Sequence, residues 1–191
     1  MGPAPRVAAV ADTTDSGPDG PPRSLLIAAV VVAVAAIVAV LAIAVLRQSS
    51  PQRAPVSIAA VPAPKATSPE CGALMAALPE RLGDYRRAPT IQPTPPGAAA
   101  WQTDSGTDPV ILRCGLDRPE EFVVGAPIQV VEPVQWFKVT DTDRSTWFAV
   151  DRPVYIALTL PAGSGPTPIQ DVSAAISQTM PAKPIDPGPA R

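Results

Sequence analysis

The chain has 191 residues, a net charge of −2 and no histidine. Without histidine, a Ser-His-Asp or Cys-His catalytic centre and a His-ligated zinc or haem are excluded. The balanced charge, with no basic cluster, argues against a nucleic-acid partner. The 27 prolines are spread over most of the sequence, so the stretches that lack them indicate where helices can form.

The clearest proline-free stretch contains residues 25–46, which are all Leu, Ile, Val or Ala. At about 1.5 Å of rise per residue, a helix of this length spans about 33 Å, slightly more than a hydrocarbon core of about 30 Å. A helix buried in a soluble protein is normally amphipathic, and a cleaved signal peptide has a shorter apolar core. We therefore expect residues 25–46 to be an uncleaved transmembrane signal anchor in the lipid bilayer.

The basic residues around this anchor do not decide its orientation, because two precede it and three follow it within about twenty positions. Residues 1–24 are a short segment rich in Gly, Pro, Asp and Thr, which predicts a disordered cytoplasmic tail. The only two cysteines, Cys71 and Cys114, follow the anchor. An isolated pair in this position predicts a disulfide in an oxidising compartment, and hence an extracytoplasmic C-terminal part.

Two segments outside the anchor lack any periodic apolar pattern. Residues 47–68 are rich in Pro, Ala, Ser and Gln and predict an extended linker. Residues 181–191 contain four prolines and predict a disordered tail. Residues 69–180 remain for one small extracytoplasmic domain.

The domain begins with a predicted helix that Ser68 can cap, that kinks at Pro79 and that ends by Gly83. Residues 169–180 carry apolar side chains at helical spacing and predict the second helix. Short apolar runs between turn residues predict the strands. These strands are 98–101, 110–114, 122–124, 128–131, 134–139, 146–150 and 154–160. The expected fold class is α+β, with two helices and a mostly antiparallel sheet.

The cysteine pair agrees with this plan. Cys71 lies on the apolar stripe of the first helix, and Cys114 ends the strand 110–114. A bridge between them encloses a proline-rich segment and contributes about 4 kcal/mol in the chain-entropy model. The alternative is two separate buried thiols.

Three aspartates are the strongest candidates for a metal site. Asp141, Asp143 and Asp151 offer the carboxylate oxygens that Ca²⁺ prefers. The sequence around them lacks the glycine and the further acid of an EF-hand loop, so a solvated hairpin turn is favoured. The segment Gly163-Ser164-Gly165 has no base to activate its serine and predicts a flexible loop. We predict no catalytic, metal-binding or cofactor-binding residues and no cofactor.

Two adjacent aromatic pairs, Trp136 with Phe137 and Trp147 with Phe148, lie on predicted strands. Alternation along a strand places one ring of each pair on each face of the sheet. One ring could therefore line the core while the other is exposed. We favour core packing over a ligand-stacking role, because the domain has few other large side chains.

The order of several short motifs resembles that of a family of actinobacterial membrane and secreted proteins catalogued as domain-of-unknown-function family 3515. The motifs are at residues 71–79, 98–101, 111–115, 134–136 and 151–155. This resemblance implies a membrane or secreted location, paired cysteines and the α+β fold. It implies no catalytic residues, since the family is uncharacterised. The polar residues 102–108 are an insertion relative to the family pattern.

These observations favour a single-pass protein of the cytoplasmic membrane whose extracytoplasmic domain binds other components, as an accessory or structural protein of the cell envelope. One alternative is a glycan-cleaving enzyme that uses carboxylates alone. That chemistry needs two acids about 5–9.5 Å apart in a cleft, and the sequence identifies no such pair. Another alternative is a subunit of a membrane complex with other envelope proteins as partners. The small alanine side chains of the anchor would allow its helix to pack closely against theirs.

Overall fold

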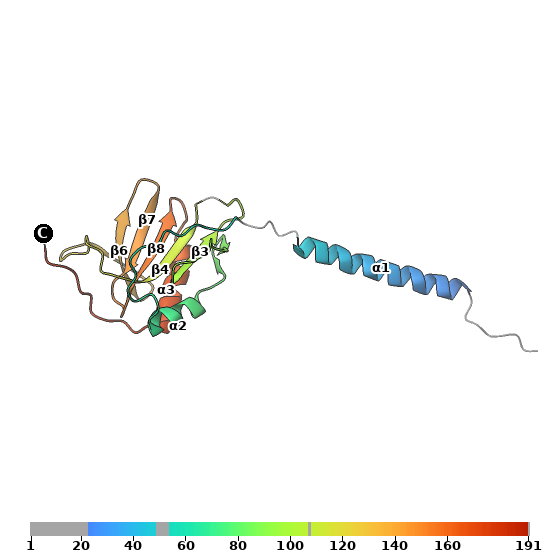
Figure 1. The fold of residues 1–191 in the computed structure, drawn as a ribbon, viewed down its shortest axis with the longest axis horizontal. Coiled ribbons are helices and arrows are strands. Elements are labelled where there is room, and N and C mark those ends of the chain that lie inside the picture. Colours follow the sequence, from blue (N-terminus) through green and yellow to red (C-terminus); the bar gives the residue numbers. More distant parts are fainter. Residues whose placement is uncertain (1–22, 49–53, 107, 191) are drawn as a thin grey trace, which may run out of the picture. The chain divides into compact units, whose positions relative to one another are not determined.

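The computed structural model describes residues 23–48, 54–106 and 108–190. The chain divides into two compact units, Met1–Ser50 and Pro51–Arg191. The described part of the first unit is helix α1, Arg23–Gln48 (Figure 1). Most of the predicted tail, residues 1–22, lies outside the described residues.

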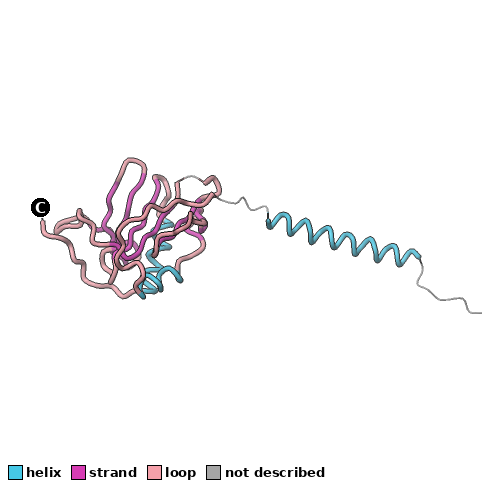
Figure 2. Tube along the Cα trace, in the orientation of Figure 1, coloured by secondary structure: helices cyan, strands magenta, loops and turns pink. Residues whose placement is uncertain are grey.

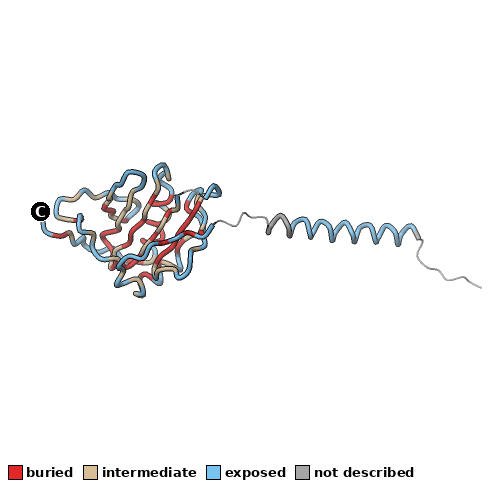
Figure 3. The backbone as a smooth tube through the Cα atoms, turned by 45° about the horizontal axis from the view of Figure 1, so that its top comes forward, coloured by how far each residue is buried: buried red, intermediate tan, exposed pale blue. Residues whose placement is uncertain are grey.

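Helix α1 is apolar on every side. Its segment Ser24–Ile43 is long and apolar enough to cross a membrane, by length and composition, and none of it is buried (Figure 3). The predicted bounds of 25–46 fall inside the observed helix. Arg23 begins the helix, and the prolines nearest to it, Pro22 and Pro51, lie outside.

The second unit is an α+β domain built on one antiparallel sheet of eight strands. Two helices, α2 (Pro69–Ala77) and α3 (Thr167–Thr179), accompany it. The strands are β1 (Arg81–Leu82), β2 (Tyr85–Arg87), β3 (Ala98–Gln102), β4 (Val110–Leu116), β5 (Ile128–Val131), β6 (Val134–Thr140), β7 (Arg144–Ala149) and β8 (Tyr155–Pro161).

The strand order is β1-β2-β3-β4-β8-β7-β6-β5, so two meanders meet where β4 pairs with β8. Figures 1 and 2 show α2 and α3 together on one side of this sheet. On that side, alternate side chains of the central strands form the main core with the helices. Trp101, Leu112, Trp136 and Ile156 are fully buried there. The predicted fold class is confirmed.

The opposite face of the sheet carries two smaller apolar clusters. One joins Val56 and Ile58 to Ala98 and Ala100 of β3. The other is formed by Phe122, Phe137 and Val150. The paired aromatics therefore divide as predicted: Trp136 faces the helices, and Phe137 packs 5.4 Å from Phe122 on the other side.

Part of the segment predicted as a linker belongs to the domain. Val56 pairs with Thr90 in a parallel bridge and is buried. Further on, the Lys65 N–H donates to the Gly115 carbonyl at 3.0 Å. A linker over residues 47–68 is therefore wrong for 54–68, while 49–53 lie outside the described residues. Two apolar side chains, Val56 and Ile58, are enough to fix this proline-rich strip on a sheet face that would otherwise be exposed.

The prediction of a disordered tail over residues 181–191 is wrong for 181–190, which run along the domain surface. The Lys183 N–H donates to Asp151 O at 2.8 Å, and the Gly188 N–H donates to Phe122 O at 2.8 Å. The predicted strand 122–124 is reduced to one bridge between Val123 and Gly188. Extended proline-rich chain can satisfy its few N–H groups in this way without becoming part of a sheet.

Helix α2, the first helix of the domain, is shorter than predicted. Ser68 Oγ accepts from the Cys71 N–H at 3.3 Å and caps its start, as expected, but the helix ends at Ala77. Leu78 caps this end, and the ring of the next residue, Pro79, cannot continue a helix. Gly83, with φ of +59°, instead forms the turn between β1 and β2, which the sequence pattern did not predict.

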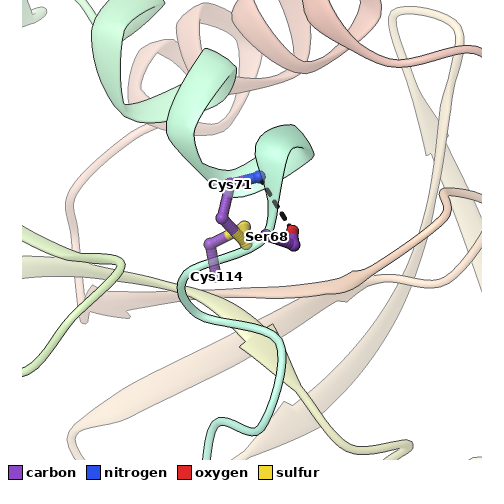
Figure 4. The surroundings of a disulfide bond; sticks show 3 residues. All are labelled: Ser68, Cys71 and Cys114. Atoms are coloured by element: carbon purple, nitrogen blue, oxygen red, sulfur yellow. Dashed lines mark hydrogen bonds between the residues drawn. A yellow bond between two sulfur atoms is a disulfide. The ribbon is translucent and has the colours of Figure 1, made fainter.

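The two cysteines form a disulfide, as predicted. Figure 4 shows Cys71 on α2 reaching down to Cys114 on β4. Their Cα atoms are 5.7 Å apart and both residues are fully buried. The bridge therefore fastens a helix of only nine residues to a central strand, a helix too short to persist without tertiary packing.

Removing the bridge will destabilise the domain. We expect Cys114→Ser to lower the free energy of unfolding by about 2–5 kcal/mol, because the unfolded chain regains loop entropy. Denaturant unfolding of the full-length protein in detergent measures this. The Cys71→Ser, Cys114→Ser double variant and the reduced wild type serve as controls and should lose a similar amount. Full stability in the reduced wild type would show that the bridge contributes nothing.

Candidate functional site

A large hollow of the domain lies on the helix side of the sheet, beyond the start of α3. It has a cavity volume of about 680 Å³, within the range of about 300–1,000 Å³ that is usual for ligand sites. Its sides come from three places in the chain: strand β5 and its turn, the turn between β6 and β7, and the loop at residues 161–166. We call it the Trp147 groove.

The floor of the groove consists of Lys138 and Thr140 of β6 and of Ser145 and Trp147 of β7. Lys138 pairs with Trp147 and Thr140 with Ser145 in the sheet register. The Lys138 Nζ lies 5.0 Å from the indole centroid, in cation–π distance. The Trp147 Nε1–H donates to Ser145 Oγ at 3.2 Å. The half-buried indole is therefore held in one orientation from two sides.

One wall of the groove is the loop that the sequence marked as glycine-rich. Gly163 and Gly165 have φ of +77° and +71°, conformations that favour glycine. The Ala162 N–H donates to the Asp143 carbonyl at 2.9 Å, which ties this loop to the β6–β7 turn. Ile169 and Gln170 of α3 continue the same wall.

Charges of both signs line the groove. Its two acids lie beyond opposite ends of β6, with Glu132 before the strand and Asp141 after it. A strand of seven residues is about 23 Å long, far more than the roughly 5–9.5 Å between the two acids of a glycan-cleaving site. The groove thus presents an aromatic ring, hydroxyls and amides for binding, and its described lining lacks a catalytic acid pair.

The three candidate calcium ligands do not converge. Asp143 pairs with Arg144 at 3.0 Å, and the hydrogen bond from that guanidinium lowers the pKa of the Asp143 carboxyl. Asp141 Oδ1 accepts from the Thr142 N–H at 2.8 Å, as in an ordinary turn. Within the described residues, no group of three or more acidic or cysteine side chains could hold a metal ion.

The third aspartate takes part in a feature that the sequence did not reveal. Asp151 and Arg152 form an ion pair at 2.8 Å, with both side chains only 2% exposed. Arg152 also donates to the Pro133 carbonyl at 3.0 Å. The pair joins the start of β6 to the segment before β8, which gives it a structural role. Neighbouring opposite charges are usually exposed, and no signal marked this pair as buried.

The structure is a small α+β domain that follows an apolar helix in the sequence. The chain belongs to the family described as protein of unknown function (DUF3515), which matches residues 30–185. No curated protein and no solved structure matches it. The family resemblance of the sequence motifs is confirmed.

The exposure of the three tryptophans gives a direct test of the groove. Trp101 and Trp136 are fully buried, whereas Trp147 is half-buried. We expect Trp147→Phe to remove most of the acrylamide-quenchable emission at a cost in stability below about 1 kcal/mol. The matched change Trp136→Phe should leave quenching unchanged and cost about 1–3 kcal/mol, because it orphans the buried Ser173 hydroxyl, 3.0 Å from the indole nitrogen. Equal quenching in all three Trp→Phe variants would contradict this assignment.

Proposed function

We propose that the chain is a single-pass protein of the cytoplasmic membrane whose extracytoplasmic domain binds a component of the cell envelope in the Trp147 groove. The observation that carries the proposal is the combination of a fully exposed apolar helix with a disulfide-bonded domain on the same chain. An apolar helix without a polar face is stable when lipid surrounds it. Disulfides persist in oxidising compartments, and the bridge therefore supports a location of the domain outside the cytoplasm.

Binding is favoured over catalysis by the chemistry of the groove. Its floor is a fixed indole ring beside the hydroxyl groups of Thr140 and Ser145. Aromatic rings with a few well-placed polar groups are typical of ligand sites. The separation of Glu132 and Asp141 along β6 disfavours the glycan-cleaving alternative at this groove. The ligand that fits best is an extended polar chain, either a protein segment or a glycan of the envelope.

The orientation of the chain is tested with reporter fusions. A reporter that is active only after export should be active when fused after Arg191 and silent when fused before Met1. A cytoplasm-dependent reporter should give the reverse pattern, and full-length protein should remain in carbonate-washed membranes. The opposite pattern, or release of a shortened protein into the medium, would refute the anchored topology.

Binding in the groove is tested by crosslinking in living cells. Gln170 and Gln178 are both exposed on α3, but only Gln170 lines the Trp147 groove. A photoreactive residue at position 170 should give a discrete adduct that disappears in the Trp147→Ala background. The same residue at position 178 is the matched control and should not give that adduct. An identical adduct from both positions, or one insensitive to Trp147→Ala, would count against the groove.

A further inference from the structure

A second cavity lies on the sheet face opposite the helices. Its volume is about 350 Å³, and its walls are the strip of residues 60–67 and the proline-rich loop 93–96. Its lining consists of small or apolar side chains and a single charged one: Ala60, Val61, Ala63, Ala66, Thr67, Pro93, Thr94, Pro95, Pro96, Ala98 and Arg113. We call it the Arg113 cavity.

The guanidinium of Arg113 is only partly satisfied. In the sheet register Arg113 stands between Ala98 of β3 and Ala157 of β8, which offer it no polar group. One terminal nitrogen donates to the Ala59 carbonyl at 3.4 Å, while Nε is buried without an acceptor. Among the described residues, the arginines in ion pairs are Arg118, Arg144 and Arg152. Burial alone lowers the pKa of Arg113, with no acidic neighbour to oppose it.

Such an arrangement costs free energy, because the buried part of this half-buried guanidinium has lost water without gaining an acceptor in exchange. Sites that bind ligands carry costs of this kind. An arginine in an apolar cavity is suited to a carboxylate or a phosphate, both of which accept two parallel N–H bonds from a guanidinium. The apolar walls suit a hydrocarbon chain attached to that head.

The cavity is held in shape from both ends. At one end, the Val56 N–H donates to Pro89 O and the Ile91 N–H donates to Val56 O, each at 2.9 Å. At the other end, the Lys65 N–H donates to Gly115 O at 3.0 Å. Because both walls are fixed in this way, a ligand would enter a preformed space and lose little affinity to ordering the protein.

We propose that the Arg113 cavity binds an anionic amphiphile, with its oxyanion head on the Arg113 guanidinium and its hydrocarbon chain against the alanine, valine and proline walls. This site is separate from the Trp147 groove and does not depend on the ligand of that groove.

The test uses the full-length chain in phosphatidylcholine nanodiscs with a diazirine-bearing dodecanoate as photoprobe. We expect peptide mapping to find the label on residues 60–67 and 93–98. Dodecanoate and dodecyl phosphate should each compete, and the more potent of the two identifies the head group. Dodecyltrimethylammonium and inorganic phosphate should not compete, since one has the wrong charge and the other has no chain.

Variants separate a binding role of Arg113 from a structural one. Arg113→Gln should reduce labelling at least tenfold while leaving the unfolding temperature unchanged or raised, because a half-buried cation with no acidic partner is removed. Arg113→Lys should retain part of the labelling, and Arg86→Gln, which changes an exposed arginine of β2, should retain all of it. Undiminished labelling of Arg113→Gln, label confined to α1, or equal competition by dodecyltrimethylammonium in the wild type would each overturn the proposal. The reporter fusions would be unaffected by any of these results.

Discussion

The fold depends on how the chain passes around the end of strand β4. Cys114 faces the helices and is bridged to Cys71 of α2, while the next residue, Gly115, lies against the turn that contains Ala66. A Cβ atom at Gly115 would come within 2.3 Å of the Ala66 nitrogen, so only glycine allows this approach. Cys114 and Gly115 thus hold α2 on one face of the sheet and the strip of residues 54–68 on the other. The Arg113 cavity is adjacent to this point, and the same contacts hold its walls in place.

The C-terminal segment is fixed to the other half of the sheet by comparable backbone contacts. Lys183 donates to the carbonyl of Asp151, whose carboxylate is buried against Arg152, and Gly188 pairs with Val123. A buried ion pair contributes little net stability, because desolvation offsets the attraction between the charges, yet breaking it costs several kcal/mol. Here the pair holds the segment that accepts the Lys183 N–H next to Pro133, just before β6. Both proline-rich flanks are therefore parts of the domain, and the Trp147 groove lies between the α3 start and β5, beyond the reach of either.

Local patterns predicted the elements that local physics determines. The run at residues 25–46, the cap at Ser68 and the alternation around Trp136 gave the apolar helix, the start of α2 and the faces of β6, and the two cysteines gave the bridge. The docking of residues 54–68 and 181–190 could not be predicted, because it rests on backbone hydrogen bonds to Gly115, Asp151 and Phe122 that are distant in sequence. For the same reason the sequence did not predict the Trp147 groove or the Arg113 cavity. The groove brings together Trp147, Ser164 and Gln170, and the cavity brings together Val61, Pro95 and Arg113, only in the folded chain.

The central claim is that both proline-rich flanks are folded onto the sheet, the N-terminal one at Gly115 and the C-terminal one at Asp151 and Phe122. Hydrogen exchange of the full-length protein in nanodiscs, read by mass spectrometry, tests it most directly. The amides of Val56, Lys65, Lys183 and Gly188 should exchange far more slowly than those of an unstructured chain. In Gly115→Ala, protection should be lost across residues 54–68. The control is Gly125→Ala, which should retain this protection, because Gly125 has a φ of +89°, similar to the +87° of Gly115, but open space around it. Unprotected amides at Val56 and Lys65 in the wild type, or equal loss in both variants, would contradict the account.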